Sequence, residues 1–509
     1  MFVFVVRRMV VSVFTLIVAT ALVYALVAIS GDPLDDLRQD QSPNRAQKIA
    51  ARAAALHLDE SIPQRYGRWA GGVAKCVVPG QGCDLGTTVR GQEVRPLLTQ
   101  AAGTTIKLVI TATVLAILLG VSVGIASALR QYSGFDYTIT FAAFLFYSLP
   151  IFWIAVLLKL YLGIQFNNWL ADPVIPLPVA LVLGAVSGLI WSTLIGGDRR
   201  RRLITGAVAG VASVAALVYL SASEWFKYPA LQPPLVIVLT FAAAVGITFL
   251  VAGLKRRGVL YAALATAGVV AVAEFALDPV LEDPSWLTVL AIGAVLLAVG
   301  IGAGQVFGGL DRGQAARAGA LTGFVGLLWM LVDRSLAAVP DYSDTVNGRL
   351  ISTIGSNTPN LEGDFWVRLL DAGSHLILPT LSIMLISFAT YSRFTRATML
   401  EVMHADYVRT ARAKGLTERT VVLRHAFRNA LIPVATLAAY DFGAVISGAV
   451  ISENVFGWQG MGSLFVTSLR EVDPNPVMAF FIVTAVSIVV FNMLADIAYA
   501  YLDPRVRLS

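Results

Sequence analysis

"DYVRTARAKGLTERTVVLRHAFRNALIP", residues 406–433, is a long polar segment in a chain that is otherwise mostly apolar. It carries six Lys or Arg residues and only two acidic residues, with a single glycine near its middle. Apolar runs lie on both sides of it, but no run inside it is long and apolar enough to cross a bilayer. The segment therefore indicates a membrane protein in which two spanning helices are joined by a structured basic connection.

The composition agrees with this interpretation. Hydrophobic residues make up 57% and charged residues 14% of the chain, and the mean hydropathy is +0.73. Soluble domains carry about a quarter of charged residues. Repeated apolar runs of ~20 residues can each span a bilayer as a helix, and their continuity excludes the alternating pattern of a β-barrel. We expect an all-α polytopic membrane protein.

The net charge of +6 comes from short Lys and Arg clusters between the apolar runs. Such clusters mark cytoplasmic loops under the positive-inside rule, so we predict membrane lipids and no nucleic acid as partners of these charges. The first run, after Arg7 and Arg8, is longer than that of a signal peptide and predicts a retained helix. The second and third helices are expected over 104–129 and 138–163. The whole pattern gives about twelve crossings with both termini in the cytoplasm.

A tract rich in Ala, Val, Leu and Gly follows the third helix. Its loops alternate between basic and Pro-rich acidic character, so its apolar runs cross the membrane back and forth. We favour a peripheral scaffold role for it, with lipid-facing support or subunit contact as alternatives. The helices of this tract are expected at about 177–196, 203–221, 235–254, 258–277, 287–306 and 318–337.

The basic elbow, as we call residues 406–433, has the pattern helix, break, helix. Apolar side chains from Met399 to Tyr407 recur at three- and four-residue steps and predict an amphipathic helix. Lys414 and Gly415 suit the end of that helix, and Thr417 suits the start of the next one. A stripe of small residues would let another surface approach the backbone; it consists of Ala411, Ala413 and Gly415. The simpler alternative is a loop that binds anionic lipid head groups.

The same segment resembles a known motif. "DYVRTARAKGL" and "LRHAFRNALIPV" are similar to the EAA loop of ABC-importer membrane subunits, most closely the dipeptide/oligopeptide branch. By position, Arg409, Thr410 and Ala411 stand where the general motif has Glu-Ala-Ala, and Gly415 matches its glycine. The general Ile-x-Leu-Pro is absent, as in the peptide branch. Further similar stretches occur in family order: "ISGDP" at 29–33, "LHLDESIPQRYGRWAGG" at 56–72, "CDLGTTVRGQEV" at 83–94, "SLPIFWIAVLL" at 148–158, "ISENVFGWQGMGSLF" at 451–465 and "YLDPRVRL" at 501–508.

The resemblance implies a type I ABC-importer permease core of six transmembrane helices, interrupted by about six inserted transmembrane helices. The implied division of the chain is a first transmembrane helix at 1–30, an extracytoplasmic segment at 31–101, core helices two and three at 102–170, the inserted helices at 171–340, an extracytoplasmic loop at 341–374, and core helices at 375–509 that include the cytoplasmic coupling loop 394–433.

The resemblance also implies the partners. A second, homologous permease would complete a heterodimeric pore, two cytoplasmic ABC ATPase subunits would hold ATP and Mg, and an extracytoplasmic binding protein would deliver the substrate at a bacterial inner membrane. The chain has no Gly-Lys pair and so no P-loop, which predicts a transport subunit with no ATPase motif, no cofactor and no metal site of its own. The residues implied in ATPase coupling are Asp406, Tyr407, Arg409, Thr410, Ala411, Arg412, Ala413, Lys414 and Gly415.

Three residues in the following helix are candidates for the translocation path or its gate. Asp441 is a charge at mid-helix, which is costly in lipid, so it should face either a water-filled path or a structural partner on a neighbouring helix. Glu453 and Phe456 lie toward the outer end, where a gate, a docking surface for the binding protein or simple interfacial anchoring are all open. We also expect Cys76 and Cys83, in the exported segment, to form a disulfide, with two free thiols as the alternative.

Two other functions stay open at this stage. The same class of permease could import nickel, haem or another small solute. An ion-coupled secondary transporter would need paired carboxylates at mid-depth, and the sequence offers one clear mid-helix acid, Asp441.

Overall fold

The computed structural model describes residues 2–76 and 82–502, apart from the side chains of 2–9, 419, 439–440, 442–448 and 495–502. The described residues form helices joined by turns and loops, with one isolated bridge between Thr87 and Glu93. Eleven of the described helical segments are long and apolar enough to cross a membrane. The prediction of an all-α polytopic membrane protein is confirmed. The twelfth expected crossing falls in α19 (Phe427–Val455), and the expected cytoplasmic tail, with most of the family-like stretch 501–508, lies outside the described residues.

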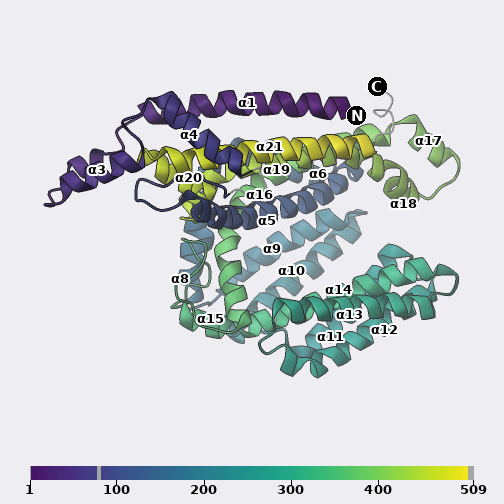
Figure 1. Ribbon diagram of the computed structural model, residues 1–509. Coiled ribbons are helices and arrows are strands. Elements are labelled where there is room, and N and C mark those ends of the chain that lie inside the picture. Colours follow the sequence, from purple (N-terminus) through teal and green to yellow (C-terminus); the bar gives the residue numbers. More distant parts are fainter. Residues whose placement is uncertain (1, 77–81, 503–509) are drawn as a thin grey trace. The chain divides into compact units, whose positions relative to one another are not determined.

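The chain divides into two compact units. Unit 1 contains residues 1–161, 353–356 and 376–509, and unit 2 contains 162–352 and 357–375. In unit 1, α1 and α21 lie side by side, and α4 packs on α1 (Figure 1). The first helices of the chain all lie in unit 1. They are α1 (Phe2–Ile29), α2 (Asp35–Arg38), α3 (Arg45–Ala55), α4 (Ile62–Lys75), α5 (Val94–Leu129), α6 (Gly134–Ser148) and α7 (Ile151–Leu158).

The expected third helix at 138–163 is wrong as one continuous helix. Proline has no N–H to donate and forces an extended conformation on the residue before it. Leu149 accordingly has φ −83° and ψ 132°, so α6 ends at Ser148 and α7 begins after Pro150. The chain continues through a π-helical stretch, Lys159–Gln165, and α8 (Phe166–Leu170).

The second helix starts earlier than expected, at Val94 instead of 104. Val94, Leu98 and Ala101 recur at helical spacing, and all three are buried in the main apolar cluster of unit 1. Packing of this face extends α5 beyond its membrane-spanning part into the predicted outer segment.

The segment of unit 1 that we predicted to be extracytoplasmic is folded, and we call it the cap. Cys76 and Cys83 form a disulfide. The Val89 N–H donates to Asp473 Oδ2 over 2.8 Å, which ties the stretch after the disulfide to the turn before α21 (Pro474–Leu502). Asp473 is almost fully buried, and this burial raises its pKa to about 6.

Unit 2 contains a helix in each of the six predicted positions. Its helices pack through small residues: a Cβ added at Gly300 would lie 2.4 Å from the carbonyl oxygen of Gly319, so only glycine allows that approach. The helices of this tract are α9 (Leu177–Ile195), α10 (Arg199–Ala222), α11 (Gln232–Val251), α12 (Arg257–Ala276), α13 (Trp286–Phe307) and α14 (Arg312–Ala337), followed by α15 (Val339–Thr345).

The loop expected at 341–374 is shorter than predicted, because α16 (Phe365–Met403) begins at Phe365. Asp364 accepts a hydrogen bond from the Val367 N–H over 2.8 Å, as a residue before a helix does when it caps the helix N-terminus. The helix then continues from unit 2 into unit 1 at Leu376 and ends at the basic elbow.

Candidate coupling site

The basic elbow begins with a break in the helix. α16 ends at Met403 and α17 (Asp406–Ala413) begins after two intervening residues, with Ala405 extended at ψ 148°. His404 Nδ1 contacts the Leu400 carbonyl over 2.7 Å, and that carbonyl would otherwise accept the His404 N–H of a continuing helix. The predicted single amphipathic helix through Tyr407 is therefore wrong at this point.

The turn after α17 has the geometry that its sequence predicted. Gly415 has φ +75°, the left-handed conformation that favours glycine. Its N–H donates to the Arg412 carbonyl over 2.9 Å, and the Leu416 N–H donates to the Ala411 carbonyl over 3.4 Å. This pair of hydrogen bonds is the Schellman motif, which satisfies carbonyls at a helix C-terminus.

The second arm of the elbow starts at Thr417, whose Oγ1 accepts the Thr420 N–H over 3.4 Å. It continues through α18 (Glu418–Thr420) and a π-helical stretch, Val421–Ala426, into α19.

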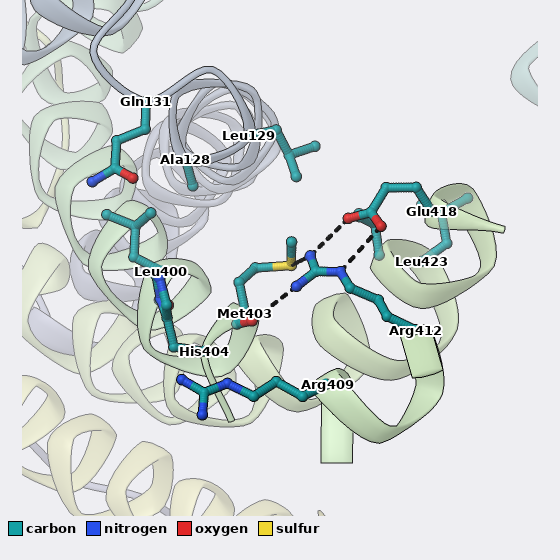
Figure 2. A pocket seen from close by; sticks show the side chains of 11 residues that line it. Ala128, Leu129, Gln131, Leu400, Met403, His404, Arg409, Arg412, Glu418 and Leu423 are labelled. Atoms are coloured by element: carbon teal, nitrogen blue, oxygen red, sulfur yellow. Dashed lines mark hydrogen bonds and ion pairs between the residues drawn. The ribbon is translucent and has the colours of Figure 1, made fainter. Parts of the chain in front are cut away.

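Arg412 connects the two arms. Its Nε and Nη2 donate to the Glu418 carboxylate over 3.1 and 2.7 Å, and its Nη1 donates to the Met403 carbonyl over 3.5 Å (Figure 2). Arg412 lowers the pKa of Glu418 through this hydrogen bond. The sequence offered opposite charges on either side of Gly415 but no indication that they meet.

The inner face of the elbow is fastened to the ends of the spanning helices. Val408 and Ala411 of α17 are buried in one apolar cluster with Met399 of α16 and Ala128 of α5. The elbow is thus a packed part of unit 1, and its orientation is fixed relative to α5 and α16.

The outer face of the elbow is free within the described chain. Ala411 is 6% exposed, so the expected stripe of small residues is not continuous at the surface. The other predicted coupling residues are all exposed: Asp406, Tyr407, Arg409, Thr410, Arg412, Ala413, Lys414 and Gly415.

A cavity of about 630 Å³ lies under the elbow. Figure 2 shows Ala128 and Leu129 from α5 on one side and the Arg412–Glu418 pair from the elbow on the other. Arg409 also lines it, 3.7 Å from the carboxylate of Asp406. Most of its cationic groups therefore already have an acidic partner within the elbow.

Asp441 has a partner on a neighbouring helix. Tyr391 of α16 is fully buried and donates its hydroxyl to Asp441 Oδ2 over 2.9 Å. This contact is the structural pair that the sequence left as the alternative to a path-lining role. Asp441 itself is half-buried, so the path-lining role stays a prediction.

Glu453 is fully buried and completes the start of α20 (Met461–Arg470). Its carboxylate accepts the Gly462 N–H and the Thr105 hydroxyl, each over 2.6 Å, and the Ser463 N–H over 3.2 Å. A carboxylate at a helix N-terminus is favoured by the free N–H groups there. Phe456 is also buried, at 1% exposed. A docking surface needs exposed groups, so this geometry favours a structural role, and the gate role stays a prediction.

Metal coordination is not suggested by the described residues, in which no three His, Cys, Asp or Glu side chains gather in a way suited to a metal ion.

A protein-family model matches the C-terminal part of the chain. Residues 258–508 match the model described as "Binding-protein-dependent transport system inner membrane component". They include the basic elbow, α19, α20 and the described part of α21, and also α12 to α14 of the tract that we expected to be inserted. The exact extent of an inserted tract therefore stays a proposal.

Curated relatives carry names from peptide transport. The chain is 44% identical over 161 residues to the oligopeptide transport system permease protein OppB of Mycobacterium tuberculosis, covering 32% of this chain and 50% of that protein. It is 41% identical over 163 residues to AppB of Bacillus subtilis, covering 32% and 50%. It is 40% identical over 138 residues to the dipeptide permease DppB of Escherichia coli, covering 27% and 41%. The chain spans about half the length of the curated relatives it matches. These matches confirm the resemblance to dipeptide/oligopeptide ABC permeases.

Proposed function

We propose that this chain is the permease subunit of an ATP-driven importer of dipeptides or oligopeptides. The observation that carries the proposal is the basic elbow: a short helix with its apolar face packed on the ends of α5 and α16 and its polar face exposed. In such an arrangement, a partner protein that binds the exposed face and moves would also move the spanning helices on which the apolar face packs. The names of the relatives support the substrate class.

The elbow would bind the cytoplasmic ATPase subunits through its exposed residues. Eight side chains or backbone positions are available for this contact, from Asp406 to Gly415 with Ala411 and Val408 excluded by burial. ATP and Mg would then be held by two ATPase subunits, which close on ATP and move the elbow. The core helices would respond by alternating between inward and outward access, the usual scheme in which a site is exposed to one side at a time.

The remaining partners follow from the same proposal. A second, homologous permease would complete the pore, and an extracytoplasmic binding protein would deliver the peptide on the side of the disulfide-containing cap. Both termini would lie in the cytoplasm of a bacterial cell, as would the elbow. Asp441 would face the path and attract the positive amino end of a peptide, while still accepting the Tyr391 hydroxyl.

Reconstitution tests the proposal. The tagged chain is purified from its native membrane, and the complex is placed in vesicles with binding protein and labelled di- and oligopeptides. We expect a co-purifying subunit with a P-loop, and uptake that requires ATP and is insensitive to collapse of ion gradients. Uptake driven by a proton or sodium gradient without such a subunit would contradict the proposal and favour a secondary transporter. ATP-driven uptake of nickel or haem without peptide uptake would overturn the substrate class alone.

A further inference from the structure

Asp136, in the first turn of α6, is a buried carboxylate with every acceptor position in use. It is 2% exposed. Arg396 of α16 donates to it through Nε over 2.7 Å and Nη2 over 2.9 Å. The Ser127 hydroxyl of α5 and the Tyr132 N–H donate to the same carboxylate, the latter over 3.1 Å. One side chain thus joins α5, the α5–α6 turn and α16.

The turn that this carboxylate holds has an unusual backbone. Tyr132 has φ +62°, a left-handed conformation that costs a bulky residue energy, and its side chain is 73% exposed. The hydrogen bond from the Tyr132 N–H to Asp136 stabilises the turn in this shape.

α5 and α16 are also in direct backbone contact beside this cluster. A Cβ added at Gly124 would lie 2.7 Å from the Ser392 carbonyl oxygen, and one added at Gly120 would lie 2.5 Å from Tyr391 Cβ. The two helices have no room to slide past each other without separating.

This cluster lies next to the apolar attachment of the elbow. Met399 follows Arg396 by one helical turn, and Ala128 follows Ser127 directly. Both Met399 and Ala128 belong to the cluster that buries Val408 and Ala411 of the elbow. Through these contacts the elbow adjoins α16 and the end of α5 close to the point where Asp136 joins them to α6.

The geometry points to a positioning role for Asp136 and Arg396 in energy coupling: the ion pair between buried Asp136 and partly exposed Arg396 makes the adjoining ends of α5, α6 and α16 one rigid body, which moves with the elbow. This inference rests on the proposed function. In this role neither residue contacts substrate or nucleotide. They keep the α5–α6 turn from deforming when the elbow moves, so that α6 moves together with α5 and α16. The two residues are 260 positions apart in the sequence, so no local sequence motif predicted that they form a pair.

The chain provides a matched control for Arg396. Arg393 lies one turn earlier on the same helix, and its guanidinium lies 4.9 Å from the ring of Phe144 and 4.8 Å from the ring of Tyr147. It thus contacts α6 through aromatic rings, and none of the described carboxylates forms an ion pair with it. Arg393→Gln removes the same charge from the same helix but leaves Asp136 and its four hydrogen bonds in place.

The test measures peptide transported per ATP hydrolysed by the assembled complex in vesicles, for wild type, Asp136→Asn, Arg396→Gln, the double variant and Arg393→Gln. We expect the ratio to fall on the order of tenfold in both single variants, with the ATPase rate of the assembled complex retained. The double variant should fall no further than the singles, because both substitutions remove the same link. Arg393→Gln should keep the wild-type ratio.

Other results overturn the inference in distinguishable ways. A purely structural pair would lower the amount of complex and reduce transport and hydrolysis in proportion, with an unchanged ratio. Equal effects of Arg393→Gln and Arg396→Gln would show that the lowered ratio comes from removing a positive charge from α16 and not from breaking the ion pair with Asp136. If one variant fails to assemble, Arg396→Lys, which keeps the charge but loses the two-pronged contact, must show the lowered ratio. A wild-type complex that shows no ATP-dependent transport would refute the proposed function itself, and the inference with it.

Discussion

Replacing Gly415 by valine should weaken binding of the elbow to the ATPase while leaving the rest of the chain folded. Gly415 has φ +75°, and an added Cβ would meet nothing within 4 Å. The cost is therefore one of backbone conformation and not of steric overlap. For a non-glycine residue in this region it is about 2 kcal/mol, which lowers the equilibrium constant for forming the native turn about 30-fold.

The elbow has little stability of its own to absorb that cost. α17 contains 8 residues, fewer than an isolated helix needs, so it depends on its C-terminal hydrogen bonds and on the burial of Val408 and Ala411. If the native elbow is what the ATPase binds, the affinity for the ATPase falls with the fraction of chains that form the native turn, by at most the same ~30-fold. ATP-driven uptake should fall accordingly.

A second glycine supplies the control. Gly253 has φ +79°, follows the C-terminus of α11 and also has open space around an added Cβ. Gly253→Val therefore carries the same backbone cost at a loop that we do not assign to coupling. The assay compares ATPase retained on the purified complex and peptide uptake for both variants at equal membrane expression. Wild-type uptake in Gly415→Val, or an equal loss in both variants, would refute the reasoning.

Three further substitutions have defined outcomes. Burial raises the pKa of Asp473 to about 6, so the folded state binds the proton more tightly than the unfolded state, and stability falls as the pH rises from about 4 to 6. Asp473→Asn keeps an acceptor for Val89 and should raise the unfolding midpoint at pH 7.5 by the equivalent of up to about 3 kcal/mol, with no gain at pH 4; a loss at both pH values would contradict this. Glu453→Gln replaces one of the two carboxylate oxygens by an amide N–H₂, which cannot accept the hydrogen bonds that the three donors around Glu453 make. We expect a loss of about 1–3 kcal/mol in thermal unfolding, whereas an unchanged midpoint would show that these hydrogen bonds at the start of α20 are dispensable. Asp441→Asn can still accept the Tyr391 hydroxyl, so assembly should be kept while uptake falls; unchanged uptake would assign Asp441 to packing alone.

The sequence predicted the parts of the fold that depend on local rules. Apolar runs placed the spanning helices, since a run of that length has one stable arrangement in lipid. Gly415 and Thr417 predicted the turn of the elbow because each satisfies the free backbone groups of a helix end. Helix boundaries were less well predicted where tertiary packing or a proline decides, as at Val94 and Pro150.

The contacts that give the candidate site its mechanics could not be predicted from local rules. Arg396 and Asp136, Asp441 and Tyr391, and Glu453 and Thr105 meet across 260, 50 and 348 residues of sequence. Nothing in a single sequence states which charged side chain on one helix faces which partner on another. Glu453 illustrates the consequence: from the sequence a gate, a docking surface and simple anchoring were all open for it, whereas the structure buries it at the start of α20.

The central claim is that the exposed face of α17 contacts an ATPase, and one measurement tests it directly. The only two cysteines of the chain are joined in a disulfide, so a single added cysteine is the one free thiol of the chain. Tyr407→Cys and Leu254→Cys place it at positions of similar exposure, 44% and 47%, on the elbow and on the loop after α11. Each purified complex is treated with a short thiol-to-amine cross-linker, and the adducts are sequenced. The account predicts an adduct between position 407 and a P-loop ATPase subunit and none from position 254. An elbow thiol that reacts only with lipid or reagent, in a complex that transports, would contradict it.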